Sequence, residues 1–191
     1  MEFVLHYSGT LKSGQSSGIK KHKHDLRCHF HHQIRKLTER DPIAQWNIPA
    51  DGLDGMEHRE GKYFFKRKDI FFAPLVNSKL QCFAEISISM LRPEGPGNLI
   101  HQTADIDNRL KTLFDSLQVP VENQMPDNET PSSEYDPFFF CLLEDDRLIT
   151  KVSVQAQRLL DPERQDKNEV DLQILVKTGS YDSTRRSDYL R

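Results

Sequence analysis

The chain has 191 residues, of which 36 % are hydrophobic and 29 % are charged, and its formal net charge is −3. This length fits one domain with a modest core, and no apolar run approaches the roughly 18 residues of a membrane span. The N-terminus lacks the basic segment and long apolar stretch of a signal peptide, and three widely separated cysteines do not suggest a disulfide framework. We therefore expect a cytoplasmic protein in a reducing compartment, with no membrane partner.

Charge is distributed unevenly along the chain. Residues 1–40 carry eight Lys and Arg against three Asp and Glu, a net charge of +5. Residues 105–146 carry two Lys and Arg against eleven Asp and Glu, a net charge of −9. The first region is suited to phosphate contacts and the second to holding a cation.

The first half of the chain predicts a strand within residues 2–10, a polar and basic loop over 12–24, and a helix capped by Asp25. Apolar side chains at spacings of three and four residues form the expected buried stripe of this helix, namely Leu26, Phe30, Ile34 and Leu37. Aromatic and β-branched residues favour strands over 62–76, and strict alternation of apolar and polar residues predicts a strand within 79–91.

The second half predicts an amphipathic helix over 105–117 and a proline-rich inserted loop over 118–137. Apolar and alternating segments then predict three more strands, within 138–143, 147–157 and 170–178. Together these elements predict an α+β domain over residues 1–180, with a mixed β-sheet and two main helices, and a polar C-terminal tail over 181–191.

Carboxylates occur at two points in the acidic region. Asp105 and Asp107 open the second helix, and Lys111 lies one turn beyond Asp107 on the same face. Glu144, Asp145 and Asp146 lie between two predicted strands. Oxygen ligands from two separate elements suit Mg²⁺. The structural alternative is that these residues only favour a helix start and a turn, as Asp commonly does.

The combined pattern D-x-D-N-x-x-K, then D-x-L, then D-D before a strand resembles the RusA-type Holliday-junction resolvases. It is carried by Asp105, Asp107, Asn108 and Lys111, by Asp115-Ser116-Leu117, and by Asp145-Asp146. The resemblance covers residues 104–118 and 138–157 by pattern. It implies a RusA-like fold, metal-binding catalytic carboxylates at Asp105, Asp107 and Asp146, a supporting metal ligand at Asp145, and a catalytic lysine at Lys111.

The resemblance implies a Mg²⁺-dependent endonuclease for Holliday junctions or other branched DNA, with Mn²⁺ as a substitute metal, acting in recombination and repair. Such a metal neutralises the phosphodiester and lowers the pKa of an attacking water. A homodimer is expected because a junction presents two symmetric strands. The alternatives are a non-catalytic nucleic-acid-binding or protein-interaction subunit, or a nuclease for single-stranded DNA, flapped DNA or RNA.

Two basic clusters are candidates for binding nucleic acid, with a solvated helix face as the alternative for the first. The first cluster comprises Lys20, Lys21, Lys23, Arg27 and Arg35, and the second comprises Lys66, Arg67 and Lys68. Aromatic pairs flank the second cluster, where stacking on bases competes with packing in the core.

Histidines and Cys28 in the first helix offer spacings compatible with zinc, but we interpret them as residues of a polar face. They are His22, His24, His29, His31 and His32. The predicted loop over 118–137 is a candidate site for a protein partner.

Overall fold

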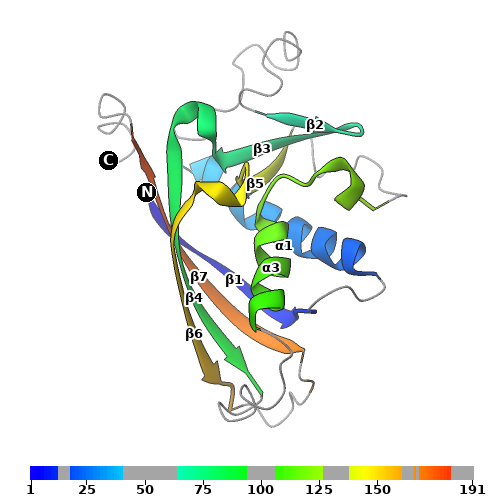
Figure 1. Ribbon diagram of the computed structural model, residues 1–191, viewed down its shortest axis with the longest axis vertical. Coiled ribbons are helices and arrows are strands. Elements are labelled where there is room, and N and C mark those ends of the chain that lie inside the picture. Colours follow the sequence, from blue (N-terminus) through cyan, green and yellow to red (C-terminus); the bar gives the residue numbers. More distant parts are fainter. Residues whose placement is uncertain are drawn as a thin grey trace.

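The computed structural model describes residues 1–12, 18–40, 64–93, 106–126, 138–160, 166 and 168–181. These residues form an α+β structure with two α-helices and two mixed β-sheets (Figure 1). The elements, in chain order, are β1 (Glu2–Thr10), α1 (Ile19–Arg40), β2 (Phe65–Arg67), β3 (Ile70–Val76), β4 (Cys82–Arg92), α3 (Ile106–Leu117), β5 (Phe139–Leu143), β6 (Ile149–Arg158) and β7 (Glu169–Ser180). Short 3₁₀ turns lie at Ser78–Leu80, Glu122–Gln124 and Asp146–Leu148. Neither α-helix is long and apolar enough to cross a membrane.

The strands divide between a four-stranded and a three-stranded sheet. The larger sheet has the order β1-β7-β4-β6, in which β7 is antiparallel to both of its neighbours and β6 is parallel to β4. The smaller sheet has the order β2-β3-β5, with β5 parallel to β3. All five residues of β5 are buried, as expected for a strand covered on both faces.

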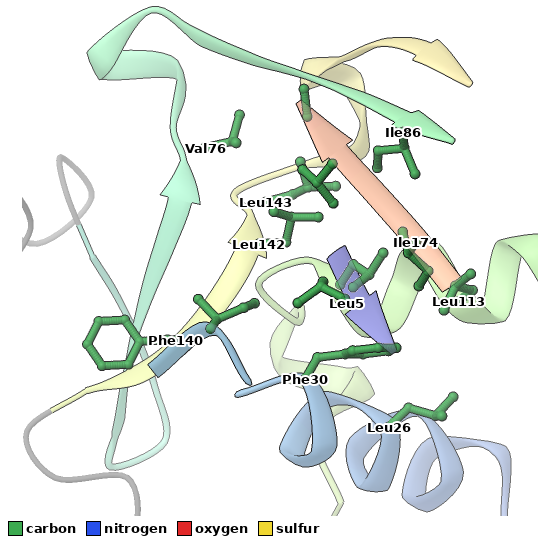
Figure 2. Close-up of a cluster of buried hydrophobic side chains, with 14 of the residues drawn as sticks. Leu5, Leu26, Phe30, Val76, Ile86, Leu113, Phe140, Leu142, Leu143 and Ile174 are labelled. Atoms are coloured by element: carbon green, nitrogen blue, oxygen red, sulfur yellow. The ribbon is translucent and has the colours of Figure 1, made fainter. Parts of the chain in front are cut away.

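Both α-helices and the smaller sheet lie on the same side of the larger sheet (Figure 1). The core forms between these layers, where Leu26 and Phe30 of α1, Leu113 of α3, Leu5 of β1 and Ile174 of β7 meet (Figure 2). The alternation predicted for β4 is confirmed, because every second residue from Cys82 to Arg92 is buried. The predicted stripe of α1 is also confirmed at Leu26, Phe30 and Ile34.

The other face of the larger sheet carries polar side chains. One row crosses all four strands with alternating charge, because the register aligns Glu2, Lys177, Glu85 and Lys151. The Lys177 Nζ atom lies 3.0 Å from the Glu2 Oε2 atom. Opposite charges on neighbouring strands favour this register over one shifted by two residues.

The predicted start of the first helix was wrong. Helix α1 begins at Ile19, so part of the predicted basic loop is helical and Asp25 lies inside the helix. The His22 amide donates to the Gly18 carbonyl at 3.0 Å, and Gly18 adopts the left-handed φ of 81°. Lysines are good helix formers, so the helix extends toward the N-terminus beyond its apolar stripe.

The segment after α3 is described over residues 118–126, where the only helical turn is the 3₁₀ turn Glu122–Gln124. This part of the predicted inserted loop packs against the smaller sheet, with Val119 and Met125 buried beside Phe139 and Cys141. The remainder of the predicted loop, 127–137, lies outside the described residues. The polar tail over 182–191 also lies outside them.

Candidate functional site

Helix α3 exposes very little of its surface. Of its twelve residues, only Asp107 and Lys111 are exposed, one helical turn apart. Buried residues include four polar ones that the apolar periodicity did not reveal: Arg109, Thr112, Asp115 and Ser116. Thr112 and Ser116 donate hydrogen bonds to carbonyls one turn earlier in the helix, at 3.1 and 2.7 Å. The exposed side of α3 thus consists of one acid and one base from the D-x-D-N-x-x-K motif.

The start of α3 is anchored by a buried arginine. Arg109 donates from Nη1 to the Leu11 carbonyl at 2.7 Å and from Nη2 to the Asn168 Oδ1 atom at 3.2 Å. The Leu11 amide in turn donates to the Asn168 carbonyl at 2.7 Å. Leu11 follows β1 and Asn168 precedes β7, so Arg109 fixes the first turn of α3 to one end of the larger sheet.

The end of α3 is anchored by a second buried arginine, Arg27 of α1. Its Nη2 atom donates to the Asp115 carbonyl at 2.8 Å and its Nε atom to the Gln118 carbonyl at 3.4 Å. These carbonyls belong to the helix end, where backbone acceptors lack partners within the helix and the helix dipole favours a cation. The prediction that Arg27 binds nucleic acid was wrong, because only 1 % of the residue is exposed.

Gln118 connects the end of α3 to the Asp145-Asp146 pair. Its Oε1 atom accepts a hydrogen bond from the Asp146 amide at 3.0 Å, and its Nε2 atom donates to the Asp115 Oδ1 atom at 3.4 Å. The following amide, that of Val119, donates to the Leu143 carbonyl at 2.9 Å. The Asp145-Asp146 pair is therefore held against the C-terminal end of α3.

The two members of the acidic pair differ in their surroundings. Asp145 accepts from the Arg147 amide and from the Arg147 Nε and Nη2 atoms, at 3.0, 2.8 and 3.1 Å. These bonds lower the pKa of the Asp145 carboxyl below its ordinary value. Asp146 is exposed. Asp145 thus shapes the turn locally, and Asp146 presents its carboxylate to solvent.

The structure does not bring Asp107 and Asp146 together within one chain. Asp107 lies in the first turn of α3 and Asp146 beside its C-terminal end, and the helix between them spans roughly 15 Å at its usual rise per residue. The sheet gives the same result, because Ile149, just after the pair, aligns with Ala84 at the start of β4. Asp171, near the Arg109 anchor, aligns with Leu91 at the far end of β4.

Carboxylate oxygens are the donors that Mg²⁺ prefers, but the predicted ligand set does not fit around one ion in a single chain. Among the described residues, no group of three or more His, Cys, Asp or Glu side chains converges as metal ligands do. Asp105, the fourth predicted ligand, lies outside the described residues. The described residues do not assemble Asp107 with Asp145 and Asp146, and both the metal and its ligands stay predictions.

The basic residues at the start of α1 divide into exposed and paired side chains. Lys20 and Lys21 are exposed in the first turn. Lys23 lies 2.5 Å from the Asp115 Oδ2 atom and is mostly buried, so much of its charge is offset. Arg35 is half-buried farther along the helix. Lys20 and Lys21 thus place positive charge at the helix end whose dipole is already positive.

The second basic cluster lies at the end of β2, with Lys66 and Arg67, and in the turn before β3, with Lys68. Arg67 donates from Nε to the Pro120 carbonyl at 2.9 Å, and Lys68 donates from Nζ to the Pro126 carbonyl at 2.5 Å. These two residues hold the segment that follows α3, while Lys66 is exposed. The flanking Phe64 and Phe72 are fully buried, in agreement with the core interpretation of these aromatics.

The histidines of α1 divide between the expected polar face, where His29 and His32 are exposed, and the interior. His24 and His31 are buried, and the His31 Nδ1 atom accepts from the Phe140 amide at 2.8 Å. The His31 ring also lies 4.5 Å from the Phe139 ring, centroid to centroid. His31 therefore joins α1 to β5. His29 is exposed and bonds to the His6 carbonyl at 2.8 Å.

Sequence reasoning missed Arg109 and Gln118, which anchor the two ends of α3. One signal was available for Arg109, because a charged residue within the apolar side of a helix indicates a buried hydrogen-bonding role. Gln118 gave no such signal, since its partner Asp146 is distant in sequence. A scan against protein-family models and searches of curated proteins and solved structures found no match.

Proposed function

We propose that this protein is a metal-dependent endonuclease for branched DNA, of the kind that the RusA-like motif implies, and that it acts as a homodimer. The observation that carries the proposal is the exposure of Asp107 and Lys111, the acid and base of that motif. They are the only exposed residues of a helix whose other polar side chains serve packing and internal hydrogen bonds.

Because Asp107 and Lys111 are exposed, their contribution to the stability of the helix is small. A solvent-exposed Asp and Lys one turn apart contribute only a few tenths of a kcal/mol to a helix. Stability therefore does not require these two residue types at these positions. The lysine ammonium is suited to pairing with a phosphate oxygen, and the neighbouring carboxylate is suited to orienting the ammonium or binding a cation.

The exposed lysines Lys20 and Lys21 support a nucleic-acid substrate. They add positive charge to the N-terminal end of α1, which favours anions through its backbone amides and dipole. Helix α1 packs against α3, and the Lys23–Asp115 ion pair joins the two helices. A phosphate backbone bound at α1 would thus run close to α3.

One observation favours a second candidate function, a non-catalytic nucleic-acid-binding subunit. Asp107 and Asp146 lie at opposite ends of α3, so one chain by itself lacks the assembled carboxylate set. Such a subunit would bind branched DNA through its basic residues without cleaving it.

Cleavage assays distinguish the two functions. Labelled four-way junction, duplex, flap, single-stranded DNA and RNA are incubated with Mg²⁺, Mn²⁺ or EDTA. We expect metal-dependent junction cleavage by the wild type, and a loss of at least about a hundredfold for Asp107→Asn, the scale expected for removing one electrostatic group from a reacting centre. Binding of the junction should be retained or strengthened, because the substitution removes a negative charge near phosphates.

The matched control is Asp25→Asn, which changes another exposed aspartate on a helix and should leave cleavage unchanged. If the wild type cleaves a different substrate, the proposal of a metal-dependent nuclease stands and branched DNA is no longer its proposed substrate. Junction binding with no cleavage under either metal would establish the binding subunit instead.

A further inference from the structure

Strand β6 forms one edge of the larger sheet (Figure 1). Among the described strands it pairs only with β4. Every second residue of such a strand directs its backbone amide and carbonyl away from its single neighbour. Most side chains of β6 are exposed as well. A row of backbone donors and acceptors on β6 is therefore accessible to another strand.

The opposite edge of the same sheet, formed by β1, is covered at its centre by α1. The His6 amide donates to the Gln33 Oε1 atom at 2.9 Å, and the Gln33 Nε2 atom donates to the His6 carbonyl at 2.7 Å. The side-chain amide of Gln33 thus takes the place of a neighbouring strand. Within the part of the chain that the structure describes, no residue bonds in this way to the outward backbone of β6.

The middle of β6 also lacks the features that keep an exposed edge from pairing. Natural edge strands commonly carry prolines or charges along their length. The cations of β6, Lys151 and Arg158, lie near its ends, and the run from Val152 to Gln157 contains neither a charge nor a proline. Val152 is 45 % exposed, although it aligns with the buried Ile86 on the apolar side of the sheet. A strand added beside β6 would cover this valine.

Charge indicates which kind of strand fits the edge. The row of alternating charge that crosses the larger sheet ends at Lys151, which aligns with Glu85. Opposite charges on neighbouring strands are favourable, so the next residue in this row should be an acid. Arg158 supplies a second cation, and β6 contains no acid. A second copy of β6 would bring only the same two cations and would not complement them.

We propose that the free edge of β6 binds an acidic segment of a partner protein, which adds to the larger sheet as an extended strand. Backbone hydrogen bonds hold such a segment, and alternate side chains give specificity. One carboxylate of the segment faces Lys151, and an apolar side chain next to it covers Val152. This interaction surface is independent of the proposed nuclease activity, because no residue of the D-x-D-N-x-x-K motif takes part in it.

A labelled peptide as long as the stretch Lys151–Arg158 provides the probe, with glutamate at both ends and alternating valine and threonine between them. We expect saturable binding to the full chain in fluorescence anisotropy. Hydrogen exchange followed by NMR should show new protection of amides between Val152 and Gln157. A peptide with lysine in place of both glutamates should bind at least about tenfold more weakly. Absence of saturable binding up to about 1 mM, or protection gained only outside β6, overturns the inference.

Two variants separate the edge of β6 from exposed surface in general. Val152→Glu sets a carboxylate against the acidic peptide and removes an apolar contact, so it should weaken peptide binding at least about tenfold. Val4→Glu is the matched control, because Val4 is 57 % exposed on the covered edge strand β1, and it should leave binding unchanged. Equal effects of the two variants overturn the inference. Circular dichroism verifies that both are folded.

A charge reversal tests the predicted complementarity. Lys151→Glu should weaken binding of the glutamate peptide and strengthen binding of the lysine peptide. If both peptides respond alike, the edge does not select an acidic partner and the inference is wrong. Sedimentation of the wild type and Val152→Glu tests a second copy as the occupant. A wild-type dimer that Val152→Glu dissociates, together with no peptide binding, also overturns the inference.

Discussion

The two ends of α3 are anchored alike but expose different chemistry. At the start, Arg109 is buried under an exposed acid and base, Asp107 and Lys111. At the end, Arg27 is buried among backbone carbonyls, and Lys23 is paired with Asp115. Asp115, which belongs to the sequence motif and lies near Arg27, thus stabilises the contact between the two helices. Residues of one sequence motif therefore differ in their roles.

We expect this difference to separate residues that stabilise the protein from residues that act in the proposed function. At each end a buried arginine anchors the helix, and exposed side chains are available to a ligand. Substitutions of the anchors should act on the free energy of unfolding, and substitutions of the exposed groups on binding and cleavage.

The largest expected effect is the loss of an arginine anchor. Arg27→Met should lower the free energy of unfolding by about 3 kcal/mol, because it leaves one buried and one half-buried carbonyl at the end of α3 without their charged donor. Arg109→Met should lower the free energy of unfolding by about 2 kcal/mol, because the Leu11 carbonyl and the Asn168 Oδ1 atom lose their charged donor. Urea unfolding followed by circular dichroism measures both, with Arg158→Met on the exposed strand β6 as the control. If Arg27→Met lowers the free energy of unfolding no more than Arg158→Met does, Arg27 is not an anchor.

A smaller effect is expected at the link between α3 and the acidic pair. Gln118→Ala removes the acceptor for the Asp146 amide and should cost about 1 kcal/mol. Hydrogen exchange followed by NMR should show faster exchange at the Asp146 amide. The Val119 amide, which donates to the Leu143 carbonyl, should keep its protection. Equal loss of protection at both amides would mean that the whole segment, and not one hydrogen bond, depends on Gln118.

The smallest expected effect has the opposite sign. Lys20→Glu places a negative charge in the first turn of α1, one turn before Lys23, and should raise the free energy of unfolding by about 0.5 kcal/mol through the helix dipole. The same change should weaken junction binding and reduce its dependence on salt concentration, since a phosphate contact is lost. Thermal unfolding and binding titrations at several salt concentrations measure the two effects. Unchanged binding would remove Lys20 from the nucleic-acid surface.

Local patterns were sufficient to predict most elements of the fold. The alternation in β4 and the apolar stripe of α1 reflect side chains that meet one continuous core, so their periods are visible in the sequence. The division into two sheets was not predictable, because pairing between β3 and β5 joins strands separated by a helix and a long segment. The edge strand β6 was predicted as a strand, but Val152 within it is 45 % exposed, since strand periodicity does not report what covers a face.

The sequence motif predicts chemistry at Asp107, Lys111 and Asp146, and all three are exposed. Their arrangement in space was not predictable. Spacing along the chain gives no information about the direction of α3 relative to β6, which decides where Asp107 and Asp146 lie. Arg27 was misassigned because basic residues on a helix look alike in sequence whether they face solvent or cap another helix.

The position of β7 between β1 and β4 has a consequence for synthesis of the chain. The amino group of Met1 donates to the Thr178 carbonyl at 3.0 Å, and among the described strands β1 pairs with β7 alone. Strand β1 is therefore synthesised long before its partner β7 exists, and contacts so distant in sequence form slowly. Until then β1 and β4 lack the strand that pairs with both of them in the sheet. Chaperones that shield newly made apolar segments should bind nascent chains that end before residue 169 and release those that include β7.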